Sequence, residues 1–249
     1  RAARIAAGHV DAVTFLGAHV VPAGADPESY LDLVTGPMLA AVAAQVSAVD
    51  VFCERGAFDE AATRRVLAAA RDAGLAARVH ANQLGHGPGV RVGVELGALS
   101  VDHLGFVSDA DIAALAGSWA DGRRGTVATV LPACDLSTRM PLAPARKLLD
   151  AGAVLAIASN CNPGTSFTTS MAFCVATAVL QMGLSVAEAV RAATLGGALA
   201  LGMHEAGWRD PQGHAQRAVG VIRPGARADL HLLDAPSAAH LAYRPGVPL

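Results

Sequence analysis

Short apolar runs alternate with helical patterns along most of this chain, and this alternation constrains the fold more than any other feature. Each run is apolar until its last residues, which is typical of strands buried on both faces of a parallel sheet. Strand followed by helix, repeated, predicts a β/α architecture. The six predicted strands span residues 12–19, 49–54, 77–82, 99–104, 126–132 and 154–160.

The segments between these runs carry signals for helix ends. Asp59 and Gly74 flank an Ala- and Arg-rich segment, which predicts an N-cap before that helix and a glycine after it. Capping-box patterns, in which a serine is followed three residues later by an acid, begin at Ser108 and Ser185. A further helix is expected over 145–152, where it ends at a glycine.

Composition excludes several classes of protein. The chain has 249 residues, 53% of them apolar and 16% charged, which is too apolar for a disordered protein. A net charge of −2 predicts no nucleic-acid partner, and no apolar run approaches the ~20 residues of a spanning helix, which predicts no membrane partner. Four scattered cysteines (Cys53, Cys134, Cys161 and Cys174) predict reduced thiols and a cytoplasmic location.

Two regions are expected along the chain. Residues 1–203 carry the alternating pattern and should form a barrel. Residues 204–249 begin with a polar loop, and 218–235 is interpreted as two short strands around a Pro-Gly turn, which predicts a small β appendage. The chain opens without an initiating Met or a signal peptide, so we expect Arg1 to lie inside a longer protein.

Polar residues stand where the predicted strands end. In a β/α barrel the active site is built at the C-terminal ends of the strands, so these side chains should share one rim. The residues concerned are His19, Glu54, His80, Asn82, Gln83, His103 and Asn160.

His80 is the strongest candidate for a metal ligand in this set, because an imidazole nitrogen suits zinc or iron. A single histidine at a strand end is more often a hydrogen-bonded core residue. However, His103 ends the next strand, and the pair favours a metal site. The four histidines beyond residue 200 are not expected to be catalytic.

The segment 159–166, SNCNPGTS, is the densest polar motif in the chain. Asn162, Gly164 and Thr165 are expected to place amide, hydroxyl and N–H groups at the start of a helix beginning near Met171. Such a helix start suits a carboxylate. The alternative is an ordinary Asn-Pro-Gly turn with a Ser/Thr cap, and the local pattern does not separate the two.

Several of these motifs together resemble the C-terminal portion of imidazolonepropionases, metal-dependent members of the amidohydrolase superfamily that act in histidine degradation. The motifs are TFLGAH, ARVHANQLGHG, SVDHL, LPACDLSTR, ASNCNPGTSFTTSM and PGARADLHLLDAP. The resemblance implies an amidohydrolase-type (β/α)8 TIM barrel lacking its first two strands, plus part of a small β-sandwich. It also implies hydrolysis of the ring amide of 4-imidazolone-5-propanoate to N-formimidoyl-L-glutamate, one zinc or iron ion, and a homodimer.

The resemblance also implies roles for single residues. His80 matches a metal ligand on the fifth barrel strand, and Asn160 stands at a metal-binding position where the family has Asp. His103 matches a histidine near the metal that is suited to carry a proton, and Gln83 matches a catalytic, substrate-contacting position. His19 matches a further substrate contact.

Within the 159–166 loop, Asn162 and Gly164 match positions that hold the product. Thr165 matches a position that contacts the propanoate side of the substrate.

Two departures from the family pattern favour a second interpretation. None of the nine histidines forms the family's His-x-His pair, and counting back from His80 places the start of the chain near the third strand. Asn160 lacks the basicity of Asp, so we expect a rate loss of roughly 10²- to 10⁴-fold. The alternative is an inactive homologue that binds ligand or a partner subunit. A nucleobase deaminase is a further alternative, against which the CNPGT sequence argues.

Overall fold

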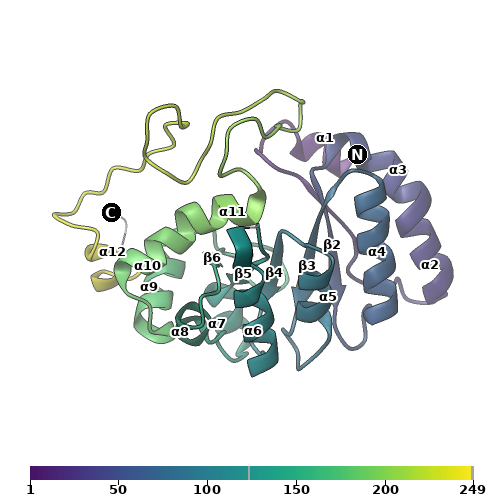
Figure 1. Cartoon of the computed structure of the whole chain (residues 1–249), viewed down its shortest axis with the longest axis horizontal. Helices are drawn as coiled ribbons and strands as arrows, with labels where there is room; N and C mark the ends of the chain where they lie inside the picture. The colour runs from purple at the N-terminus through teal and green to yellow at the C-terminus, as the bar shows by residue number, and fades with distance from the viewer. Residues whose placement is uncertain (123, 248–249) are drawn as a thin grey trace.

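A parallel six-stranded sheet forms the centre of the molecule, with the strands in sequential order. The computed structural model describes residues 1–122 and 124–247, and Figure 1 shows the sheet between the helices. All six predicted strands are confirmed. They are β1 (Thr14–Ala18), β2 (Ala48–Cys53), β3 (Ala76–Ala81), β4 (Ser100–His103), β5 (Val127–Val130) and β6 (Leu155–Ile157).

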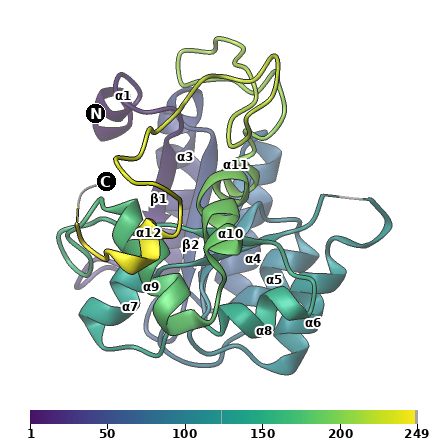
Figure 2. The ribbon, with the colours of Figure 1, turned by 90° about the vertical axis from the view of Figure 1, so that its left-hand side faces the viewer.

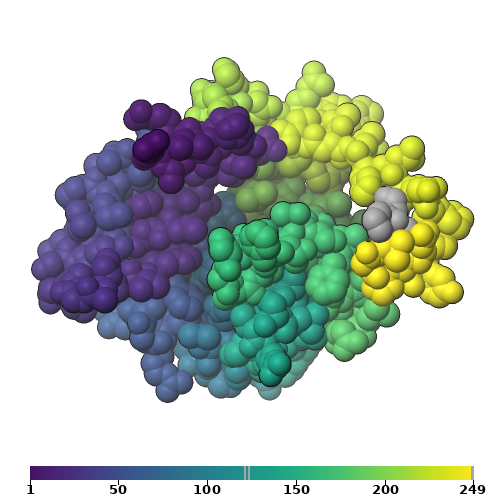
Figure 3. All heavy atoms as spheres, turned by 180° about the vertical axis from the view of Figure 1, so that it is seen from behind, coloured from purple at the N-terminus to yellow at the C-terminus, as the bar shows by residue number. Residues whose placement is uncertain are grey.

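The sheet is open. Each strand pairs with the next one in sequence, and β1 and β6 stand at the two edges without pairing to each other among the described residues. Seen from behind, the N-terminal segments and the C-terminal half lie on either side of a hollow (Figure 3). Sequential parallel order is the arrangement of strands in a β/α barrel, and here that arrangement is not closed.

Helices connect the strands, and α4, α5 and α8 pack on β2, β3 and β6 respectively. The longer helices are α2 (Pro27–Leu33), α4 (Glu60–Asp72), α5 (Gly89–Glu95), α6 (Asp109–Gly117), α7 (Pro132–Thr138), α8 (Ala145–Asp150), α9 (Met171–Met182) and α10 (Val186–Arg191). The shorter helices are α1 (Ala2–Ala6), α3 (Leu39–Val42), α11 (Gly197–Leu201) and α12 (His240–Tyr243). No helix in the described ranges is long and apolar enough to span a bilayer.

The sequence signals for helix ends are confirmed. The Asp59 carboxylate accepts a hydrogen bond from Ala62 N at the start of α4, and the capping boxes at Ser108 and Ser185 are both formed. Gly74, which follows α4, has a φ of 71°, a conformation that glycine adopts without steric cost.

The core lies between the sheet and its helices, and β5 is buried along its whole length. Gly196 shows how close this packing is: a Cβ atom at that position would lie 2.0 Å from the carbonyl oxygen of Leu155 in β6. Cys53, Cys134 and Cys174 are buried, Cys161 is exposed, and all four are free thiols, as expected.

The expected strands in 218–235 are wrong: this segment contains no strand in the structure. Its large apolar side chains at Ile222 and Leu232 are 90% and 93% exposed. A strand needs a hydrogen-bonded neighbour, and a lone two-stranded ribbon is marginally stable in water. The segment instead passes over the body as a loop before reaching α12, which packs on α9 (Figure 2).

Candidate metal and substrate site

Four side chains from neighbouring strands meet near the C-terminal edge of the sheet. A ring nitrogen of His80, Nδ1, lies 3.0 Å from a carboxylate oxygen of Asp50, and Nε2 of His19 lies 3.7 Å from the same carboxylate. The centroid of the His80 ring is 4.8 Å from that of His19 and 5.0 Å from that of His103. We call these four residues the strand-end cluster.

Strand register explains the meeting. Asp50 in β2 is paired with Arg78 in β3, and His80 follows Arg78 by two residues, so Asp50 and His80 share one face of the sheet. His80 in turn is paired with Asp102 in β4, whose Oδ2 lies 4.0 Å from His80 Nδ1. The histidine therefore stands between the buried carboxylate of Asp50 and the largely buried carboxylate of Asp102.

Burial and charge shift the pKa values of the cluster in opposite directions. Burial acts to raise the pKa of Asp50, but the charge of His80, its hydrogen bond with that residue and the nearby His19 outweigh it and hold that pKa well below its usual range. Burial acts to lower the pKa of His80, and the charge and hydrogen bond of Asp50 raise it to about 9. Burial, aided by the charge of His80, lowers the pKa of His103 to about 3.

At the ends of β3, β4 and β6 the backbone adopts a left-handed conformation that non-glycine residues avoid. Asn82, His103, Leu104 and Asn160 have φ values of 55°, 83°, 66° and 50°. Asn82 is held by its Nδ2, which donates to the carbonyl oxygen of Phe106 at 2.7 Å. Left-handed non-glycine residues cost free energy and cluster at functional sites in proteins. The concentration at this edge supports a site there.

Two other strand-end residues pair with each other. The Glu54 carboxylate accepts a hydrogen bond from the backbone N–H of Gln83 at 2.6 Å. Burial raises the pKa of Glu54, against the opposing effect of hydrogen bonds from the backbone of Gln83 and Leu84. Glu54 therefore fixes the loop that carries Gln83.

The 159–166 loop is bonded mainly within itself. The Asn162 Oδ1 accepts from the N–H groups of Gly164 and Thr165, both at 2.8 Å, and its Nδ2 donates to the carbonyl oxygen of Asn160 at 2.7 Å. The expected position of these groups at a helix start is wrong, because α9 begins at Met171 and is capped by Ser170. The alternative of an Asn-Pro-Gly turn describes the local geometry.

Asp50 is the cluster member that the sequence reasoning missed. It lies inside the run VDVFCE, whose apolar residues predict a strand and whose terminal Glu54 marks the polar strand end. A signal was present, because a carboxylate inside a strand buried on both faces must have a partner. Asp102 in SVDHL carries the same signal.

The residues present fit a zinc or iron ion. One ligand atom from each of His19, Asp50 and His80 lies within 4.8 Å of the others, and no other such group of His, Cys, Asp or Glu occurs in the described ranges. Nε2 of His19 and Nδ1 of His103 are buried without a hydrogen-bond partner. Nitrogen and carboxylate donors of this kind suit both metals.

Comparison with known proteins points to the same family as the sequence motifs. An imidazolonepropionase from Arthrobacter sp. (strain FB24) is 68% identical over 253 residues, covering 100% of this chain and 62% of that protein. The chain is a homologue of the imidazolonepropionases. It spans about 60% of the length of the curated relatives it matches. No protein-family model matches it.

Solved structures show the fold alone. A zinc-bound adenosine deaminase from Xanthomonas campestris has a TM-score of 0.67 at 22% identity, covering 91% of this chain and 56% of that one. An amidohydrolase from a Sargasso Sea sample has a TM-score of 0.61 at 21% identity, covering 92% and 53%. The α/β fold with six parallel strands thus matches the amidohydrolase barrels.

Proposed function

We propose that this chain carries part of the active site of an imidazolonepropionase, which hydrolyses the ring amide of 4-imidazolone-5-propanoate to N-formimidoyl-L-glutamate. The observation that carries the proposal is the strand-end cluster, in which ring nitrogens of His19 and His80 and a carboxylate oxygen of Asp50 lie within 4.8 Å of one another. The 68% identity to a named imidazolonepropionase supports this substrate over those of other amidohydrolases.

The architecture is part of the proposal. In it, β1–β6 are the last six strands of a (β/α)8 barrel formed by residues 1–203, and 204–249 is a separate C-terminal segment. The sequential parallel order and the two open edges support this assignment. A homodimer, which the family resemblance implies, is tested by sedimentation of the purified protein.

Each residue has a proposed task. A zinc or iron ion held by His80 would polarise the ring carbonyl and lower the pKa of the attacking water. His103 is the proposed proton carrier, because its Nδ1 has no hydrogen-bond partner: it would accept a proton from the attacking water and deliver it to the ring nitrogen as the amide C–N bond breaks. His19 and Gln83 contact the ring. Thr165 contacts the propanoate, and the turn that Asn162 and Gly164 form holds the product.

A second candidate function rests on Asn160. The family resemblance places Asp at this position, and an amide is a poorer ligand and base than a carboxylate. The chain would then be a homologue that binds ligand or a partner subunit without turnover.

Turnover by the zinc-loaded chain and its Asn160→Asp variant separates the two functions. Product formation is measured by mass spectrometry of N-formimidoyl-L-glutamate. We expect Asn160→Asp to raise the rate by roughly 10²- to 10⁴-fold, the usual worth of general acid–base help. Equal rates of turnover in the two proteins would contradict the rate loss expected from Asn160. Binding of substrate without product by either protein would favour the second candidate.

A further inference from the structure

We propose that Asp50 is a positioning residue: it accepts a hydrogen bond from Nδ1–H of His80 and so presents Nε2 of that ring to the metal. The inference rests on the proposed function, because it assumes that His80 binds a metal. It adds a residue to the site that the family motifs in this sequence did not indicate.

The contact itself is specific. Two carboxylates lie beside the His80 ring, and only Asp50, at 3.0 Å from Nδ1, is within hydrogen-bond distance. Asp102 is 4.0 Å away, and its Oδ1 is buried without a partner. The side chains of Asp50 and His80 are 5% and 17% exposed, so water does not readily replace their interaction.

The chemistry of the pair fixes the role of each nitrogen. A carboxylate can only accept a hydrogen bond, so the ring nitrogen facing Asp50 carries the proton. In a neutral imidazole the other nitrogen then has the free lone pair. Histidines that bind metals in proteins commonly donate their second N–H to a carboxylate, which orients the ring and strengthens it as a ligand.

The position of Asp50 in the sheet supports positioning over direct ligation. Asp50 is paired with Arg78, one pleat before His80, whereas substrate reaches a barrel at the C-terminal strand ends. Asp50 thus approaches His80 from the side away from that edge. A metal bound jointly by Asp50 and Nδ1 would have to break the 3.0 Å hydrogen bond between them.

The test uses zinc alone as the probe. In the zinc-loaded chain labelled with ¹⁵N-histidine, long-range ¹H–¹⁵N spectra show which ring nitrogen of His80 keeps its proton. We expect a proton on Nδ1 and zinc on Nε2. Zinc on Nδ1, with no proton there, would mean that Asp50 is a direct ligand and would overturn the inference.

Zinc affinity of variants gives a second readout. Competition with a chromophoric chelator should show a 10- to 100-fold loss for Asp50→Ala, the usual effect of removing such a partner. Asp50→Asn keeps the volume and an acceptor oxygen, so we expect a smaller loss and a retained fold. Asp102→Asn is the matched control and should change zinc affinity by less than about threefold, because Asp102 makes no hydrogen bond to the ring. Unchanged affinity in both Asp50 variants would contradict the assignment.

The outcomes also separate this inference from the proposed function. Zinc on Nε2 of His80 without hydrolysis of 4-imidazolone-5-propanoate would remove the function and leave the role of Asp50 intact. Hydrolysis with zinc on Nδ1 would do the reverse. A chain that binds no zinc would overturn both.

Discussion

Two histidine–aspartate pairs in this molecule have the same chemistry and different surroundings. In the strand-end cluster, Nδ1 of His80 lies 3.0 Å from Asp50 on the adjacent strand, with both side chains largely buried. In the C-terminal segment 204–247, Nδ1 of His214 lies 3.3 Å from Asp210 in the same loop, and the His214 side chain is 75% exposed. Solvent-exposed ion pairs contribute little to stability. In a buried pair the two charges interact more strongly, but removing them from water costs free energy, so the pair needs good geometry.

The difference teaches where this chain places its chemistry. Strand register brings residues that are 30 positions apart, such as Asp50 and His80, to one buried point. The C-terminal segment offers polar groups of the same types, but turns hold them at the surface. A rigid, buried frame is what separates a candidate site from solvated polar residues.

The largest expected effect is on metal binding. Because His80 is the proposed ligand, His80→Ala should weaken zinc affinity by roughly 10³-fold, more than the 10- to 100-fold loss from removing a positioning partner. His214→Ala in the C-terminal segment is the control and should leave affinity unchanged. Chelator competition measures both, and equal losses would remove the distinction between the two pairs.

A second comparison concerns apolar side chains in the same two regions. Leu148 in α8 is fully buried, whereas Leu232 in the C-terminal segment is 93% exposed. We expect Leu148→Ala to lower the free energy of unfolding by about 3 to 4 kcal/mol, through lost burial and the cavity left behind. Leu232→Ala should change it by less than about 0.5 kcal/mol. Urea denaturation measures both, and a large loss at Leu232 would show that the segment packs against something in solution.

The pH dependence of stability should have opposite signs at two carboxyl groups, Asp135 and Asp11. Burial raises the pKa of Asp135, which lies in α7 just beyond β5, to about 7 from an ordinary value of 3.8. The folded chain therefore holds a proton that the unfolded chain releases, and the stability from Asp135 is lost as pH rises from about 4 through 7. We expect this loss to be on the order of 2 to 3 kcal/mol. Asp135→Asn should flatten that part of the profile.

Asp11 provides the opposite case. A hydrogen bond from Arg227, in the C-terminal segment, holds the pKa of Asp11 below its usual range against a smaller effect of burial. Its contribution is present above the unfolded pKa and is lost as pH falls. Denaturation of the unmodified chain and Asp11→Asn from pH 3 to 8 checks the direction. We expect the two profiles to differ at high pH and to converge as pH falls. Profiles that coincide at high pH and diverge only at low pH would contradict it.

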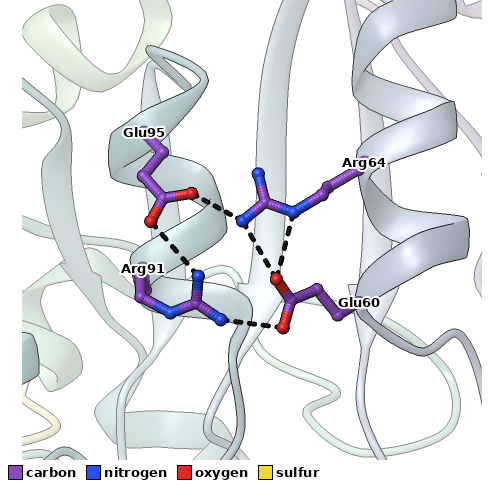
Figure 4. A network of polar contacts seen from close by, with 4 residues as sticks. All are labelled: Glu60, Arg64, Arg91 and Glu95. Atoms are coloured by element: carbon purple, nitrogen blue, oxygen red, sulfur yellow. Dashed lines mark hydrogen bonds and ion pairs between the residues drawn. The ribbon is translucent and has the colours of Figure 1, made fainter.

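The smallest effect is expected at the ion-pair network between α4 and α5. Glu60, Arg64, Arg91 and Glu95 alternate in charge and contact one another at the surface (Figure 4). Exposed pairs of this kind contribute little and are screened by salt. Arg91→Ala should shift the urea midpoint slightly in low salt and not in 1 M salt. A shift that persists in 1 M salt would mean that the network has a packing role.

Sequence predictions that depended on neighbouring residues were confirmed, whereas one that depended on a distant partner was wrong. The strands from Thr14 to Ile157 and the capping boxes at Ser108 and Ser185 depend on residues within a few positions of one another, and all were found. The strands expected over 218–235 failed because pairing depends on a neighbour, and the described residues supply none to that segment.

For the candidate site, the sequence alone determined which residue types are present and that they lie at the C-terminal edge of the sheet. His19, His80 and His103 stood at predicted strand ends, and parallel strands share their C-terminal edge. Only the tertiary structure decided that Asp50, three positions before the end of β2, reaches His80, and that Asn162 bonds within its own turn. The physical reason is that periodicity records which face of a strand a side chain occupies, whereas register and burial decide which partner it meets there.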